Sequence, residues 1–103
     1  MKIKWDPEAK SAMRQVAHYI NMRFGRKARQ GFLQRVKDTE KLIKSSPNIG
    51  QIDPLYVDRP ETYRSIIIYG LNKLIYRIEG EIIFIAAFWD TRQEPEAQAE
   101  KTK

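Results

Sequence analysis

The sequence predicts an α+β fold, in which an N-terminal strand and a helix hairpin pack on a mainly antiparallel sheet of three to four strands. The first observation is the segment Tyr63–Asp90, which holds three runs rich in Ile, Tyr, Phe and Trp. Breaks that contain Gly70 and Gly80 separate these runs, as expected for consecutive antiparallel strands. The second observation is the apolar spacing of residues 7–45, which indicates two amphipathic helices that cover a sheet.

The chain begins with a short strand followed by a helix. Lys2–Trp5 alternates polar and apolar residues, and we place this strand at a sheet edge. Asp6 can cap the helix, Pro7 suits its first position, and Glu8 suits the positive end of its dipole. Gly25 ends the helix. The apolar face of this helix comprises Ala9, Ala12, Met13, Val16, Ile20 and Phe24.

A second helix is predicted from about Lys27 to Ser45, and we expect Phe32 at the centre of its inner face to lie in the core. The inner face comprises Ala28, Phe32, Val36, Thr39 and Ile43, widened by Leu33 and Leu42. The opposite face comprises Gln30, Gln34, Lys37, Lys41 and Lys44. Ser and Pro residues from Ser45 to Gly50 stop the helix.

The remaining segments are a loop and a tail. Residues 47–62 carry three prolines and lack a sustained period, which predicts a loop whose residues 55–57 contact the body of the protein. Residues 1–95 are expected to form a single domain. Residues 96–103 are polar and lack large apolar side chains, which predicts a disordered tail.

Strict alternation sorts the strand residues into two faces, and it places Lys73 and Tyr76 on opposite faces of the middle strand. In the last strand it opposes two groups, Ile82, Phe84, Ala86 and Phe88 against Ile83, Ile85, Ala87 and Trp89. Both groups are apolar, so the pattern leaves open which face of the sheet meets the helices.

Composition excludes several classes of protein. The chain has no Cys, and therefore no disulfide and no cysteine metal site. Its one His, His18, cannot build a histidine metal cluster. No apolar run is long enough for a membrane span, and the N-terminus lacks a signal-peptide core. We therefore expect a cytoplasmic protein with no metal, no small-molecule cofactor and no membrane partner.

Positive charge is concentrated in one segment. The chain has a net charge of +6. Residues 23–44 contain eight Lys and Arg residues and two acidic residues, Asp38 and Glu40. The net charge of this segment, eight minus two or +6, equals that of the whole chain. Such a stripe suits a nucleic-acid backbone or an acidic protein partner. The alternative is a solvated helix face without a partner.

Basic groups on the strands form the one unusual constellation of polar residues. They are Arg64, Lys73, Arg77 and Arg92, with Tyr63 and Tyr76 among them. A metal-independent ribonuclease needs a base, an acid and cations that stabilise the charge of the phosphorane, and these residue types can supply them. The structural alternative is that the Lys and Arg side chains extend from the sheet to water. Arg64 also has a possible ion-pair partner in Asp90.

Six short motifs, in order over about residues 3–95, resemble the RelE/ParE superfamily of bacterial toxins. They are Trp5-Asp6-Pro7-Glu8-Ala9, Tyr19-Ile20 with Phe24-Gly25, Pro47-Asn48-Ile49-Gly50, Tyr63-Arg64-Ser65, Lys73 to Ile78, and Ile85 to Pro95. The resemblance implies the growth-inhibiting toxin of a type II toxin–antitoxin system, held inactive by a cognate antitoxin. One branch of the superfamily poisons DNA gyrase, and the other cleaves mRNA on the ribosome.

The end of the chain favours the gyrase branch. Nuclease members carry a Tyr or His near the C-terminus, whereas this chain has no aromatic residue after Trp89. It also lacks their lysine-rich run before Tyr63, where Arg59 is the basic residue of the loop. The ending Arg92-Gln93-Glu94-Pro95 looks closer to the ParE-like branch. A RelE-like endoribonuclease is the alternative, and a basic RNA-binding module is the second alternative.

The site residues follow from this resemblance and from the charge pattern. If the chain is a nuclease, the resemblance implies catalytic roles for Lys73 and Arg92. From the basic groups on the strands we add Arg64 as a supporting cation and Tyr76 as an alternative proton-transfer group. If it is a binding poison, we expect Arg92 to anchor the target. For the antitoxin we expect a binding surface of Lys37, Lys41 and Lys44, on which an acidic, partly disordered segment folds as it binds.

Overall fold

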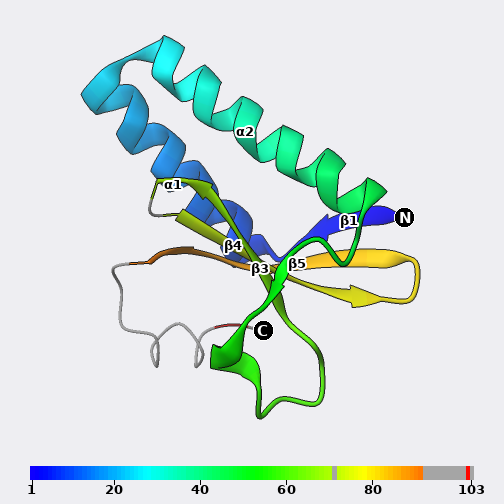
Figure 1. Cartoon of the computed structure of the whole chain (residues 1–103). Coiled ribbons are helices and arrows are strands. Elements are labelled where there is room, and N and C mark those ends of the chain that lie inside the picture. Colours follow the sequence, from blue (N-terminus) through cyan, green and yellow to red (C-terminus); the bar gives the residue numbers. More distant parts are fainter. Residues whose placement is uncertain (71, 92–101, 103) are drawn as a thin grey trace.

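The structure is a computed structural model, and it describes residues 1–70, 72–91 and 102 of the 103-residue chain. Within this part, two helices lie on one face of a five-stranded sheet (Figure 1). The elements are β1 Lys2–Trp5, α1 Pro7–Phe24, α2 Arg26–Ser45, β2 Gln51–Ile52, the 3-10 helix η1 Pro54–Tyr56, β3 Arg64–Tyr69, β4 Asn72–Glu79 and β5 Ile82–Asp90. The predicted α+β fold is confirmed.

The helix hairpin begins and turns where the sequence predicts. The carboxylate of Asp6 accepts hydrogen bonds from the backbone N–H groups of Glu8 and Ala9, at 3.0 and 3.3 Å, and so caps α1. Gly25 separates the two helices with a φ of 95°, a left-handed value that a side chain would disfavour. Because one residue makes the turn, α1 and α2 pack directly against each other (Figure 1).

The sheet has the strand order β1-β5-β4-β3-β2, and only the number of strands differs from the prediction. It has five strands rather than three or four, because β2 pairs with β3 through Gln51 and Ile52, within the predicted loop. The sheet is mainly antiparallel, as predicted: β1 runs parallel to β5 at one edge, and the other pairs are antiparallel. The placement of Lys2–Trp5 at a sheet edge is confirmed.

The helix-covered face of the sheet holds the main core. Phe32 is fully buried, as predicted, and its ring meets that of Phe88 edge-on at 6.1 Å. The core also contains Ala9, Met13, Ala17, Ile20, Val36, Ile43, Ile68, Leu74, Tyr76, Ile83 and Ile85. Two apolar residues assigned to the inner helix faces are exposed instead: Phe24 is 67% exposed and Leu42 is 44% exposed. Phe24 is at the last position of α1.

A bulge in β5 overturns the strict alternation predicted for that strand. Ile75 pairs with Ala87 and Tyr76 pairs with Ile85, so Ala86 is an extra residue. Phe88 therefore joins Ile83 and Ile85 in the helix-side core, although alternation opposes them. Ala86 and Ala87 both pack on the other face.

The second face of the sheet is covered in part by the segment between β2 and β3. Tyr56 in η1 and Tyr63 just before β3 are each 2% exposed, and they pack with Ile75, Ala86 and Ala87. The prediction that residues 55–57 contact the body holds through Tyr56, whereas Val57 is 77% exposed. We call this side of the sheet the open face, because neither helix lies on it (Figure 1).

Candidate functional site

Tyr76 lies at the centre of β4 with its side chain toward the helices and fully buried. Its hydroxyl donates a hydrogen bond to the carbonyl of Pro47 at 2.7 Å and accepts one from the N–H of Gly50 at 3.0 Å. Burial raises the pKa of Tyr76, so the phenol stays protonated at neutral pH. In this arrangement the hydroxyl holds the chain that leaves α2 against the sheet.

Arg64 of β3 pairs with Tyr76 of β4. Like Tyr76, it bonds the chain that leaves α2. Its Nη1 donates to the carbonyl oxygens of Gly50 and Asn48, at 2.8 and 3.2 Å. The guanidinium of Arg64 thus bonds backbone carbonyls rather than Asp90, the ion-pair partner considered from the sequence. Asp90 lies at the far end of the sheet, opposite Asn72.

Lys73 lies on the other side of β4 from Tyr76. Its Nζ forms an ion pair with the carboxylate of Asp53 at 2.9 Å, and the two side chains are 14% and 4% exposed. The same carboxylate caps η1 by accepting the N–H of Leu55 at 2.9 Å. Lys73 therefore fastens η1 to the open face.

The structure does not bring the predicted catalytic residues to one point. Arg64 and Tyr76 meet beside Gly50, whereas Lys73 meets Asp53 across the sheet. Arg92, the fourth member of the set, lies outside the described residues. Each of the three described side chains has a role in holding the segment between α2 and β3. Their catalytic assignment stays a prediction.

The sequence reasoning missed a cluster of aromatic rings and guanidinium groups on the open face. The rings of Tyr56 and Tyr63 stack with centroids 4.8 Å apart. The guanidinium of Arg59 lies 5.1 and 5.3 Å from these two centroids. Arg77 lies over the ring of Phe84 at 4.5 Å. The pairing of tyrosines seven positions apart follows from the course of the loop, which no local pattern revealed.

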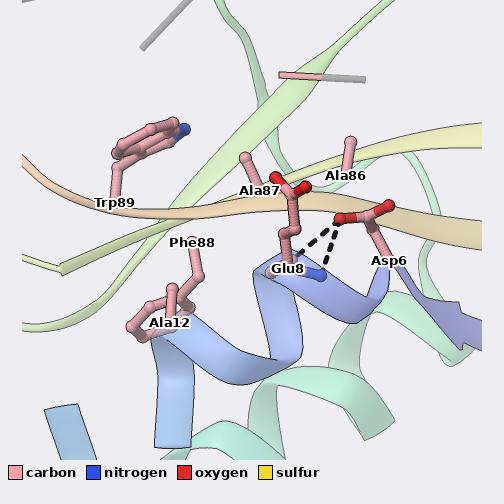
Figure 2. Close-up of a pocket in the computed structure, with 8 residues that line it drawn as sticks. Asp6, Glu8, Ala12, Ala86, Ala87, Phe88 and Trp89 are labelled. Carbon is pink, nitrogen blue, oxygen red and sulfur yellow. Dashed lines mark hydrogen bonds between the residues drawn. The ribbon is translucent and has the colours of Figure 1, made fainter. Parts of the chain in front are cut away.

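A small pocket lies between the start of α1 and the end of β5 (Figure 2). Its lining comprises Asp6, Glu8, Ala9, Ala12, Ala86, Ala87, Phe88 and Trp89. Figure 2 shows Phe88 and Trp89 on opposite sides of β5, with Phe88 toward Ala12. Asp6 is the helix cap, and the lining contains no cation. The pocket thus holds none of the predicted site residues.

The predicted antitoxin-binding lysines lie on the outer side of α2. Lys37, Lys41 and Lys44 are all exposed, while Phe32, Val36 and Ile43 of the same helix are buried. The stripe is therefore available to a partner. Within the described residues, no helix is long and apolar enough to cross a membrane, and no group of three His, Cys, Asp or Glu side chains could hold a metal ion.

Comparison with known proteins identifies the family. Residues 3–95 match the family described as the ParE toxin of the type II toxin-antitoxin system, parDE. The chain belongs to the ParE toxin family. A search of curated proteins found no match.

A solved structure shares the fold of this ParE family member. It belongs to the chromosomal ParDE toxin-antitoxin system from P. aeruginosa, and it matches with a TM-score of 0.71 at 17% sequence identity. The match covers 89% of this chain and 97% of that chain. The prediction of a RelE/ParE superfamily toxin is therefore confirmed, and the motifs at residues 5–9 and 85–95 fall within the family match.

Proposed function

We propose that this chain inhibits bacterial growth by binding DNA gyrase in the cytoplasm, and that a cognate antitoxin neutralises it. The observation that carries the proposal is the match of residues 3–95 to the ParE toxin family. This match covers the helix hairpin and the whole sheet, which are the parts that could form a binding surface. The solved neighbour comes from a ParDE toxin-antitoxin system, which supports an antitoxin partner.

The contacts on β4 support a binding poison over a nuclease. A general acid or base must reach the proton that it transfers. Tyr76 is fully buried and bonded to two backbone groups, and Lys73 is paired with a buried carboxylate. Freeing either group for proton transfer would break contacts that hold the segment between α2 and β3.

For the target we propose Arg92 as an interface anchor. Arg is among the residue types that contribute most to binding energy at protein interfaces. In the sequence Arg92 comes two residues after β5, whose core residues Ile83 and Ile85 are fully buried. Asp90 and Thr91 can shape the turn through local hydrogen bonds of their side chains.

For the antitoxin we propose the exposed stripe of Lys37, Lys41 and Lys44. The three side chains lie on one side of α2 at spacings of four and three residues, and so form a continuous positive surface. An acidic segment that is disordered when free can fold along such a surface, with its charge compensated on binding.

The proposal is tested by expressing the chain alone in a bacterium and measuring growth, gyrase-linked DNA breaks and cleaved mRNA. We expect growth arrest with DNA breaks, and rescue when the antitoxin is co-expressed. Arg92→Ala should abolish the arrest while the protein remains folded and still binds the antitoxin. Arg14→Ala is the matched control, because Arg14 is an exposed residue of α1.

Three outcomes would contradict the proposal. Ribosome-dependent mRNA cleavage that Lys73→Ala slows would identify the nuclease alternative. RNA binding without any growth arrest would identify the basic RNA-binding module. A folded Arg92→Ala protein as toxic as the wild type would remove Arg92 from the site in either branch.

A further inference from the structure

The open face of the sheet holds the side chain of Thr102. Thr102 is 4% exposed, although its side chain is polar. Thr is mostly exposed in proteins, and a buried hydroxyl group ordinarily has hydrogen-bond partners. The groups that surround Thr102 therefore explain its burial.

Three side chains contact Thr102 through hydrogen bonds. The hydroxyl of Tyr56 lies 2.8 Å from the Thr102 Oγ1, and the indole Nε1 of Trp89 donates to the same oxygen at 3.3 Å. The guanidinium of Arg59 donates to the carbonyl oxygen of Thr102 at 2.7 Å. Both the side chain and the backbone of one residue are thus recognised.

These groups come from two separate parts of the fold. Tyr56 belongs to η1 and Arg59 follows it, whereas Trp89 lies near the end of β5. The lysine–carboxylate pair of Lys73 and Asp53 fastens η1 to the sheet, so the two parts keep a fixed separation. Thr102 lies between these two parts and is hydrogen-bonded to both.

The three side chains are matched to a ligand that accepts hydrogen bonds. A guanidinium and an indole N–H are donors only, and a phenol can donate as well. Tyr56 is 2% exposed, so an apolar occupant would leave buried polar atoms without partners, which is costly. A hydroxyl oxygen and a carbonyl oxygen from one residue satisfy all three groups.

We propose that the open face carries a peptide-binding pocket for a hydroxyl-bearing residue, formed by Tyr56, Arg59 and Trp89, and that the chain's own Thr102 is its ligand. The ligand class is a Thr or Ser together with its main-chain carbonyl. When Thr102 of the same chain occupies the pocket, it joins residue 102 to η1 and to the end of β5. The proposal concerns contacts within the chain and is independent of the gyrase target.

The two tryptophans of the chain allow a direct test on the full-length protein. The indole N–H of Trp89 bonds Thr102, while that of Trp5 bonds the carboxylate of Glu40 at 3.2 Å and serves as the internal control. In the NMR spectrum of the 15N-labelled protein, Thr102→Val should shift the Trp89 indole signal and speed its hydrogen exchange by up to about tenfold. The Trp5 signal should not move.

The matched variant is Thr102→Ser, which keeps the hydroxyl and loses one methyl group. It should retain the wild-type Trp89 signal and exchange rate. Tyr56→Phe is a second test, because removal of the phenol hydroxyl should shift the Trp89 indole signal while Thr102 is unchanged. A Trp89 signal identical in the wild type and Thr102→Val, or an equal shift in Thr102→Ser, would overturn the proposal.

Dilution distinguishes the source of the ligand. If Thr102 enters the pocket of its own chain, the Trp89 signal is independent of protein concentration. If the signal changes on dilution together with a change of molecular mass in sedimentation, the pocket binds the C-terminus of a second copy. That result would overturn the assignment of Thr102 as the ligand of its own chain.

Discussion

The hydroxyl of Tyr76 lies 3.0 Å from the backbone nitrogen of Gly50, and this hydrogen bond joins the middle of the sheet to the segment that leaves α2. The approach is so close that a Cβ at Gly50 would lie 2.7 Å from the Tyr76 hydroxyl oxygen and 3.1 Å from the Arg64 Cβ. Gly50 is thus required for the backbone to reach the buried phenol.

Gly50→Ala is therefore expected to destabilise the protein by about 1–3 kcal/mol, because the new methyl group overlaps a buried ring that cannot move away. Urea unfolding measures the change. Gly31→Ala is the control: a Cβ there meets nothing within 4 Å, and Ala favours the interior of α2 over Gly by about 1 kcal/mol. Equal stability of Gly50→Ala and the wild type would show that the close approach does not exist.

Tyr76→Phe should destabilise the protein by about 1–3 kcal/mol at neutral pH, because the Pro47 carbonyl and the Gly50 N–H both lose their partner. Burial raises the pKa of Tyr76 above its ordinary value near 10. The contribution of this group is then fully present below about pH 10 and is lost as pH rises through the raised pKa of the folded state.

The difference in unfolding free energy between the wild type and Tyr76→Phe should therefore shrink above pH 10. Burial also raises the pKa of Tyr56, but both proteins retain that residue, so its effect cancels in the comparison. A difference that stays constant from pH 7 to beyond pH 11 would contradict the burial of a protonated Tyr76.

Lys73→Ala should destabilise the protein on the order of 3 kcal/mol, because it leaves the carboxylate of Asp53 buried without its ion-pair partner. The double variant Lys73→Ala with Asp53→Ala should recover part of the loss, since no unpaired charge remains. A denaturant series on the two single variants and the double variant gives the coupling energy. Additive effects would mean that the pair contributes nothing.

Reversal of the charges of Lys37, Lys41 and Lys44 to Glu should weaken antitoxin binding by about tenfold or more at low ionic strength. The effect should diminish with added salt, because the stripe is exposed. The matched control reverses Lys2, Lys10 and Arg14, which are also exposed and carry the same charge. Calorimetric titration that finds equal affinity for the stripe variant and the wild type would remove the stripe from the interface.

The sequence by itself determined the elements whose causes are local. The Asp6 cap, Gly25 between the helices and Gly70 and Gly80 in the strand breaks act on neighbouring residues, so their positions could be read along the chain. The position of Phe32 in the core followed from the period of α2 in the same way. The resemblance to the RelE/ParE superfamily also predicted the class of protein, a toxin of a type II toxin–antitoxin system.

The tertiary structure alone decided which distant groups meet. Lys73 could have pointed to water, but the course of the loop brings Asp53 to it. The two-residue strand β2 and the extra residue Ala86 depend on a partner strand, and no period in the sequence encodes them. The disordered tail predicted at residues 96–103 lies outside the described residues except for Thr102, which is buried by contacts with Tyr56 and Trp89. Periodicity reports neighbours along the chain, whereas these pairings depend on distances that exist only after the chain has folded.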